Sequence, residues 1–231
     1  MNELKNFVKK ITPKIIKRKL YAYYYRAIIN DHYRNSLEKE RLIPLYELKE
    51  LHIKNLKVLP NRYDLLKQLP KKGVVAEIGV DKGDFSKQIL INNFPEKLHL
   101  IDVWSSERYN QEKRKEVEMK FKNEIGLQKV VINLGYSTSV VNNFEDSYFD
   151  WIYIDTNHSY ETTKEELKLY SPKIKKGGII AGHDYVVGYW NGLVKFGVIE
   201  AVNEFCICNE WELVYLTMEN RDHRSFAIRK I

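Results

Sequence analysis

Acidic and imidazole side chains gather in two segments of the chain, and each segment follows a short apolar run. Asp155 and His158 follow one run, and His183-Asp184 follows the next. Because the carboxyl ends of neighbouring parallel strands meet at one edge of a sheet, we expect these side chains to converge there. Carboxylates and imidazoles together suit a divalent cation such as Mg²⁺ or Mn²⁺. A simpler interpretation is that His158 caps the next helix and Asp184 caps a turn.

A glycine-containing loop follows an earlier apolar run. Gly79 and Gly83 let the backbone turn tightly and approach a ligand closely. A dinucleotide-binding loop of the G-x-G-x-x-G pattern needs glycine at 81 and 84, where this chain has aspartate. Carboxylates at these positions repel a pyrophosphate and suit a ligand with a cationic sulfonium and an ammonium group. Taken alone, the loop also fits a tight turn without a ligand.

A further acid, Asp102, ends the next apolar run, 19 residues after Gly83. Nucleotide-binding α/β folds place at this spacing the carboxylate that accepts hydrogen bonds from ribose hydroxyls. The spacing therefore favours a nucleoside ligand over a strand that ends in Asp by chance. The following run leads into Gly135-Tyr-Ser137, a loop that we expect to contact the adenine, although this tripeptide is also ordinary in turns.

Short apolar runs that alternate with amphipathic segments position these residues, a pattern typical of a parallel sheet with crossover helices. We expect parallel strands at 74–80, 98–103, 130–134, 151–155 and 178–181, and helices at 84–93, 107–124, 159–170 and 197–207. The runs at 211–217 and 225–229 have no helix between them, which predicts an antiparallel pair. Residues 70–231 are thus predicted to form a Rossmann-like, doubly wound α/β domain with a mostly parallel seven-stranded sheet and a C-terminal antiparallel hairpin.

Residues 1–69 are predicted to form a basic amphipathic helical arm and a connector. Residues 1–20 hold seven basic side chains and one acid, whereas the rest of the chain holds 31 basic and 30 acidic ones. Nucleic-acid enzymes usually line the substrate cleft with positive charge, so this balanced body disfavours nucleic acid as a partner. The arm suits either peripheral contact of residues 1–20 with an anionic membrane or packing on the body or on a second subunit of a homo-oligomer.

The sequence predicts a cytoplasmic protein, because no apolar run has the length of a membrane span and the start lacks the pattern of a signal peptide. Cys206 and Cys208 fall on different faces of an expected helix, so we expect two reduced thiols rather than a disulfide.

Taken together, residues 62–205 resemble the class I methyltransferases of the macrocin O-methyltransferase and methyltransferase-24 type, which use S-adenosylmethionine. The resemblance covers about two-thirds of the chain. It rests on Glu77-Ile-Gly-Val with Gly83-Asp-Phe-Ser86, Ile101-Asp-Val-Trp104, Ile154-Asp-Thr-Asn-His-Ser-Tyr160, Lys176-Gly-Gly178, Ala181-Gly-His-Asp-Tyr185 and Ala201-Val-Asn-Glu-Phe205.

This resemblance implies transfer of a methyl group to a hydroxyl of a sugar or glycosylated metabolite, often with Mg²⁺. It implies that His158 is the general base beside Asp155, and that Asp155 and Asp184 hold the cation; His183 completes the predicted metal set. The family's usual Asp-Gly-Asp-His sequence is replaced by Asp-Thr-Asn-His at 155–158. The residues predicted to bind S-adenosylmethionine are Glu77, Gly79, Asp81, Gly83, Phe85, Ser86, Asp102, Val103, Trp104, Ser137 and Asp155.

Two other functions fit parts of the same pattern. One is methyl transfer to another acceptor, such as nucleic acid or a small aromatic molecule. The other is a membrane-associated nucleoside-binding protein without catalysis, which the intact set of Asp102, Asp155, His158 and Asp184 argues against. The segment 186–196, with Tyr189, Trp190 and flanking glycines, fits equally a lid that stacks on a sugar ring and a packed irregular loop.

Overall fold

The computed structural model describes residues 18, 19, 21, 23–26, 38, 41–189, 194–220 and 223–231. Packing divides the chain into two compact units, of which the larger comprises residues 44–187 and 196–231 and the smaller comprises 1–43 and 188–195. Most of the predicted basic arm, together with Trp190 and Gly192 of the predicted lid, lies outside the described residues. In the described part of the chain, no helix has the length and apolar character needed to cross a membrane.

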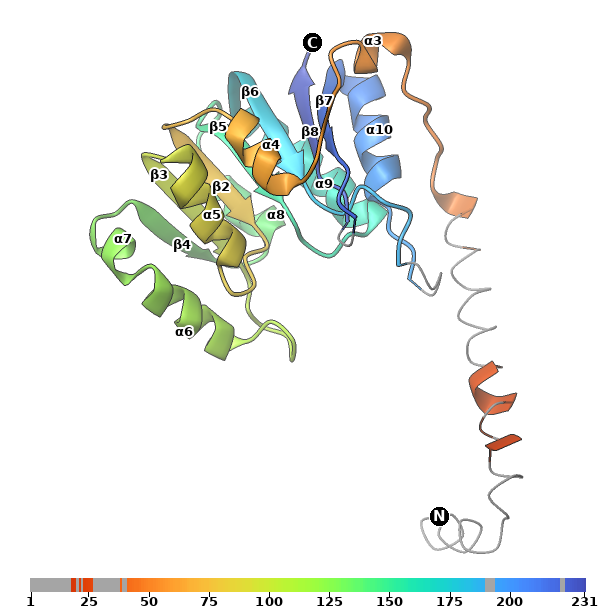
Figure 1. Cartoon of the computed structure of the whole chain (residues 1–231), viewed down its shortest axis with the longest axis horizontal. Coiled ribbons are helices and arrows are strands. Elements are labelled where there is room, and N and C mark those ends of the chain that lie inside the picture. Colours follow the sequence, from red (N-terminus) through yellow and green to blue (C-terminus); the bar gives the residue numbers. More distant parts are fainter. Residues whose placement is uncertain are drawn as a thin grey trace, which may run out of the picture. The chain divides into compact units, whose positions relative to one another are not determined.

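An eight-stranded sheet forms the centre of the larger unit (Figure 1), in the order β1-β7-β8-β6-β5-β2-β3-β4. Strand β8 is antiparallel to both of its neighbours, and the other pairs are parallel. The predicted α/β class, the mostly parallel sheet and the C-terminal hairpin are confirmed. The strands are β1 (Lys57–Leu59), β2 (Val74–Ile78), β3 (Lys97–Asp102), β4 (Val130–Leu134), β5 (Phe149–Ile154), β6 (Ile174–Gly182), β7 (Trp211–Thr217) and β8 (Phe226–Lys230).

Strand β1 is one strand more than the seven predicted. It has three residues, lies at the edge of the sheet beside β7, and buries none of its side chains fully. Such a strand carries no alternation of apolar and polar residues, so the sequence pattern could not reveal it.

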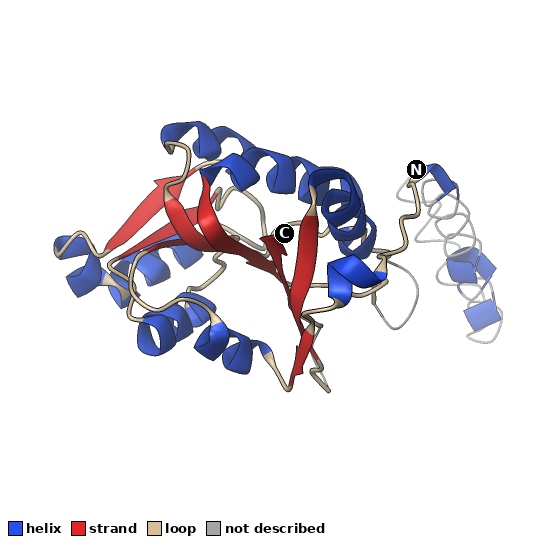
Figure 2. Ribbon diagram, turned by 90° about the horizontal axis from the view of Figure 1, so that it is seen from above, coloured by secondary structure: helices blue, strands red, loops and turns tan. Residues whose placement is uncertain are grey.

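Helices cover both faces of the sheet (Figure 2). The predicted helix at 107–124 is two helices that meet at Phe121, and the first begins later than predicted because the Asn110 side chain caps the backbone NH groups of residues 112 and 113. Cys206 and Cys208 are free, as predicted. The helices are α3 (Glu50–Ile53), α4 (Arg62–Gln68), α5 (Asp84–Asn93), α6 (Gln111–Lys120), α7 (Lys122–Gly126), α8 (Ser137–Val140), α9 (Tyr160–Tyr170) and α10 (Val198–Asn209), with 3-10 turns at Val141–Asn143 and Ser171–Lys173.

The central strand β5 shows how the two layers of helices create two cores. Trp151 and Tyr153 pack into the core that includes α4, α5 and α6. Ile152 and Ile154 pack into the opposite core, with α9 and α10. Because β5 is buried on both sides, its residues 151–154 form a continuous apolar run. Full burial of one such side chain stabilises the fold by about 1.5–3 kcal/mol. The loops that leave the middle of the sheet therefore follow well-packed strands.

The carboxyl ends of β2, β5 and β6 lie side by side because the strands pair in parallel register. Ile154 pairs with Ile78 on one side and with Gly182 on the other. The register continues past the strand ends, since Asp155 N donates to Ile78 O at 2.7 Å and His183 N donates to Ile154 O at 2.9 Å. The loops that follow these strands therefore leave the sheet at the same place.

The close approach of two strand ends predicts the effect of a glycine substitution. Gly79 has φ 90°, and a Cβ atom there would lie 1.9 Å from the carbonyl oxygen of Asp155. We expect Gly79→Ala to lower the free energy of unfolding by more than about 1 kcal/mol, because the backbone must shift and adopt a conformation unfavourable for alanine. Denaturant unfolding measures the change.

A matched control is Gly126→Ala in α7. No atom lies within 4 Å of the position of its Cβ, so this variant should be as stable as the wild type or about 1 kcal/mol more stable. Equal stability of the two variants would contradict the role given to Gly79.

Candidate active site

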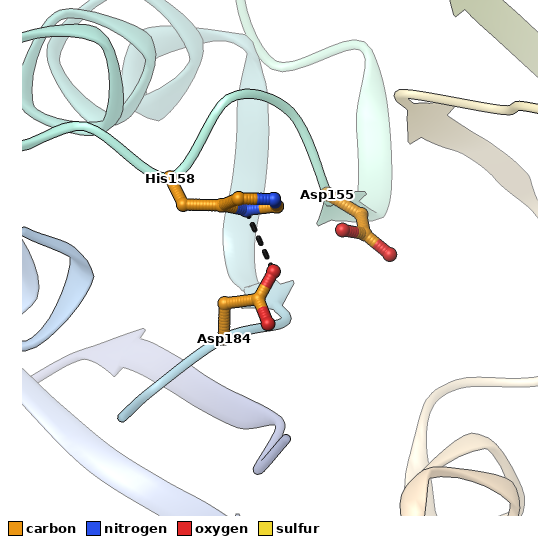
Figure 3. Close-up of side chains that lie close together, drawn as sticks. All are labelled: Asp155, His158 and Asp184. Carbon is orange, nitrogen blue, oxygen red and sulfur yellow. Dashed lines mark ion pairs between the residues drawn. The ribbon is translucent and has the colours of Figure 1, made fainter. Parts of the chain in front are cut away.

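The loops after β5 and β6 bring together Asp155, His158 and Asp184, whose side chains face a common space (Figure 3). Nδ1 of His158 lies 2.6 Å from Oδ2 of Asp184. One potential ligand atom of each side chain lies within 4.8 Å of the others, so the group has the dimensions of a metal site. The structure thus brings the predicted base together with two of the three predicted metal ligands.

Both partners of the His158–Asp184 contact have unusual backbone conformations. His158 has φ 62° and Asp184 has φ 60°, in the left-handed region that favours glycine. Conformations of this kind cost about 1–3 kcal/mol each and cluster at functional sites. The two loops therefore hold these side chains face to face at some cost in stability.

Asp184 is a buried carboxylate that is kept ionised by its neighbours. Burial alone would raise the pKa of Asp184, but hydrogen bonds from His158 and His183 and the charges of both rings hold it well below its usual range. His183, the third predicted metal ligand, is itself buried, with Nδ1 3.4 Å from Oδ1 of Asp184 and 3.8 Å from Oδ2 of Asp155. Burial would lower the pKa of His183, yet the two carboxylates raise it overall.

Asp155 differs from Asp184 in its electrostatic environment. Burial raises the pKa of Asp155, and the charge of Asp184 raises it further, while His183, His158 and Arg62 act in the opposite direction. The site therefore combines one firmly ionised carboxylate with a second that holds its proton more tightly.

A third imidazole, which the sequence analysis missed, reaches the same carboxylate. Nδ1 of His223, in the loop between β7 and β8, forms a hydrogen bond with Oδ1 of Asp184. Strand β8 runs antiparallel to β6 with Phe226 opposite Gly182, so the residues before β8 lie beside those after β6. No motif marks His223, and the predicted hairpin would have found it only if the strand order had been known.

Phe196 closes one side of this group of imidazoles. Its buried ring lies 4.8 Å from the ring of His158 and 5.4 Å from the ring of His223, between centroids. Phe196 ends the predicted lid segment, and in the structure it is packed against the site.

The glycine loop after β2 is held by Asp102. Oδ2 of Asp102 accepts hydrogen bonds from Val80 N at 2.8 Å and Asp81 N at 3.2 Å, and Oδ1 accepts one from Trp104 N at 3.0 Å. Trp104 is fully buried, and its Nε1 donates to Asp81 O at 3.0 Å. Asp102 and Trp104 thus shape the loop, and direct contact of either with a ligand stays a prediction.

The other predicted binding residues near this loop lie at the end of β2, in the loop, at the start of α5 and directly after β3. Gly83 precedes α5 with φ 73°, and Ser86 donates a hydrogen bond to the buried Glu77. Burial raises the pKa of Glu77 well above its usual range. Further residues are placed as follows: Asp81 pairs with Lys113, the Phe85 ring packs on Tyr153, and Val103 is half-buried.

Ser137, predicted to contact an adenine, is linked to the β5 loop by a buried acid that sequence analysis missed. Glu166 on α9 accepts hydrogen bonds from Ser137 Oγ at 2.5 Å and from Thr156 Oγ1 at 2.9 Å. Burial raises the pKa of Glu166 to about 7, although both hydrogen bonds lower it. Glu166 therefore connects the loop after β4 with the loop that carries Asp155.

One protein family matches part of the chain in sequence. Residues 76–185, which include the three clustered side chains, match the model of the Methyltransf_24 family, a methyltransferase domain. No curated protein matches the chain in sequence.

Solved structures share the fold at low sequence identity. TrmK from M. capricolum, in complex with S-adenosylhomocysteine, is 18% identical, with a TM-score of 0.53 over 74% of this chain and 69% of its own. An rRNA methylase from Streptococcus thermophilus is 13% identical, with a TM-score of 0.52 over 81% of this chain and 99% of its own. A protein from Corynebacterium glutamicum is also 13% identical, with a TM-score of 0.54 over 99% and 96%.

The buried carboxyl of Glu166 predicts a pH-dependent stability. Unfolded Glu166 loses its proton near pH 4.5, whereas the folded protein holds it to about pH 7. Between these values the folded state binds more protons, so stability falls as pH rises. We expect Glu166→Gln to raise the free energy of unfolding relative to wild type by up to about 3 kcal/mol at pH 8 and not at pH 4. Urea unfolding across this range measures the difference.

The control is Glu165→Gln, an exposed neighbour on the same helix. This variant should keep the wild-type dependence on pH. If Glu166→Gln also kept it, the raised pKa of Glu166 would be refuted.

Proposed function

Because residues 76–185 form a methyltransferase domain of the Methyltransf_24 family within a class I fold, we propose that this chain methylates a hydroxyl group of a sugar or a glycosylated metabolite. The chain is a class I S-adenosylmethionine-dependent methyltransferase. We propose, in addition, that the acceptor is a hydroxyl, that His158 and Asp155 are catalytic and that a divalent cation assists the reaction.

The observation that carries this proposal is the contact between His158 and Asp184. Nδ1 of His158 faces an ionised carboxylate at 2.6 Å, which leaves Nε2 to accept a proton from the acceptor. An imidazole titrates near neutral pH and is well suited to this role. Asp184 orients the ring and stabilises the imidazolium that forms.

Methyl transfer to a hydroxyl is an in-line displacement at the methyl carbon. The acceptor oxygen forms a bond to this carbon while the carbon–sulfur bond breaks and its electron pair goes to sulfur. The hydroxyl proton passes to Nε2 of His158, and S-adenosylhomocysteine leaves as a neutral thioether. The protein's contribution is to hold the oxygen in line and remove the proton.

The donor set also fits a divalent cation. Asp155 and Asp184 supply carboxylate oxygens, the ligands that Mg²⁺ and Mn²⁺ prefer, and His183 lies beside both. A cation held by these residues would supply Lewis-acid activation of the acceptor hydroxyl. His158 belongs to the same cluster and also has the position of a third ligand, so separate experiments are needed for its two roles.

The charge balance of the chain favours an uncharged acceptor, such as a sugar hydroxyl, over a nucleic acid. Residues 21–231 hold 31 basic and 30 acidic side chains, a balance that offers little attraction to a polyanion.

The role of His158 predicts a loss of turnover. We expect His158→Ala to lower the rate of methyl transfer by about 10²–10⁴-fold, the range for removal of a general base, with nearly unchanged affinity for S-adenosylhomocysteine. Labelled S-adenosylmethionine with a panel of glycosides measures the rate, and calorimetry measures binding.

His52→Gln is the matched control. His52 fills the third position of α3 in a capping box, where glutamine also serves, so this variant loses an imidazole away from the site and keeps the cap. It should retain full activity. Full activity in His158→Ala would move the base role to Asp155 or His183.

If a divalent cation assists the reaction, the rate of methyl transfer should depend on metal. Chelation should suppress methyl transfer, and added Mg²⁺ or Mn²⁺ should restore it, while the affinity for S-adenosylhomocysteine stays nearly constant. Asp155→Asn should weaken cation binding in calorimetry, because an amide is a weaker ligand than a carboxylate. If His158→Ala weakens it equally, His158 is a ligand rather than the base. Full activity in excess chelator, with metal analysis finding no bound ion, would remove the cation from the proposal.

A further inference from the structure

Arg62 begins α4 and lies outside the segment that matches the family. The Asn61 side chain caps this helix, and Leu65 and Leu66 anchor it in the core. The backbone NH of Arg62 also donates to Oε1 of Glu219 at 2.6 Å. The start of α4 is thus held from several sides, and α4 lies beside α5 (Figure 1), the helix that follows the glycine loop.

The side chain of Arg62 extends toward the predicted cofactor site. Its Cζ lies 5.2 Å from the centroid of the Phe85 ring, which packs on Tyr153 with centroids 4.4 Å apart. Burial is the main influence on the pKa of Glu77 and of Asp155 and raises both, and the charge of Arg62 lowers both. The guanidinium therefore lies within electrostatic reach of the carboxyl ends of β2 and β5.

The order of the strands fixes the direction of the cofactor in the proposed function. Ribose is expected at Asp102 after β3, and the methyl group must face His158 after β5. Strand β2 lies between these two strands. The methionine part of S-adenosylmethionine must therefore lie near the ends of β2 and β5, where Glu77 and Asp155 lie.

The methionine part has one anionic group, its α-carboxylate, which would lie near the acidic side chains at the ends of β2 and β5. Glu77, Asp155 and Asp184 offer oxygens that repel a carboxylate when they are ionised. Lys113, a cation on α6, contacts Asp81 in the glycine loop. Arg62 has both the position and the charge that the carboxylate requires, and a guanidinium binds a carboxylate through two parallel hydrogen bonds.

We propose that Arg62 binds the α-carboxylate of the methionine part of S-adenosylmethionine. This inference rests on the proposed function, because it assumes that the cofactor lies between Asp102 and His158. It makes α4 a part of the cofactor site and gives the amino-acid end of the cofactor its counter-ion.

The test compares two ligands by calorimetry. S-adenosylhomocysteine has the carboxylate, and its decarboxylated analogue keeps the amine and lacks only that group. We expect wild type to bind the analogue about 10- to 100-fold more weakly, and Arg62→Gln to bind S-adenosylhomocysteine more weakly by a similar factor. Arg62→Gln should bind the two ligands with nearly equal affinity, because the group that distinguishes them is gone.

Two further variants make the result specific. Arg62→Lys should recover part of the discrimination, since it restores the charge and not the paired hydrogen bonds. Lys67→Gln removes an exposed cation from the same helix and should leave both affinities unchanged. If Arg62→Gln folds poorly, Arg62→Lys still tests the inference, because retention of full discrimination would oppose a bidentate contact.

The outcomes separate this inference from the function on which it rests. If wild-type protein fails to bind S-adenosylhomocysteine, the cofactor site and this inference both fail. If wild type binds and Arg62→Gln weakens both ligands by the same factor, Arg62 has a structural role and only this inference fails. Unchanged affinity in Arg62→Gln overturns it equally.

Discussion

The site depends on the contacts between the ionised carboxylate of Asp184 and the imidazoles around it. A buried charge is strongly unfavourable without partners, and here imidazoles from three places supply them. His158 contacts one oxygen of Asp184, and His223 contacts the other, with His183 nearby. Each imidazole gains an anionic partner in return. Removal of Asp184 would leave three rings without the carboxylate that they contact, so Asp184 orients His158, the proposed base.

The parallel register of the sheet makes this arrangement possible. His158 and His183 follow adjacent strands, β5 and β6, and backbone hydrogen bonds extend the pairing to the first residues of both loops. Gly79 lets the end of β2 approach the carbonyl of Asp155, where any side chain would collide. The same strand ends therefore supply the glycine loop and the loop that carries Asp155 and His158, so the predicted cofactor loop and the proposed base leave the sheet side by side.

Local sequence patterns predicted those features that depend on neighbouring residues in the sequence. Strands β4 and β7 have the predicted limits, since each is a mostly apolar run that begins directly after a charged residue. Asp155, His158 and Asp184 converge because parallel strands end at one edge. His223 and Arg62 were missed, because an antiparallel pairing and a helix–helix contact bring them to the site. Glu166 was missed for a related reason: it lies on the buried face of an amphipathic helix, where a carboxyl is unexpected until its partners Ser137 and Thr156 are known.

Some of the residues around His158 lie inside the segment that matches the family, and others lie outside it. The matched segment, 76–185, contains the glycine loop, Asp102 and the His158–Asp184 pair, to which the proposed function assigns contacts with the methyl donor and removal of the proton. Phe196 and His223 contact this pair from outside the segment. Any acceptor that reaches Nε2 of His158 must pass close to them. In the proposed function, residues on the flanks of the matched segment therefore contribute to selectivity for the acceptor, whereas the proposed base and its carboxylate partner lie within the segment.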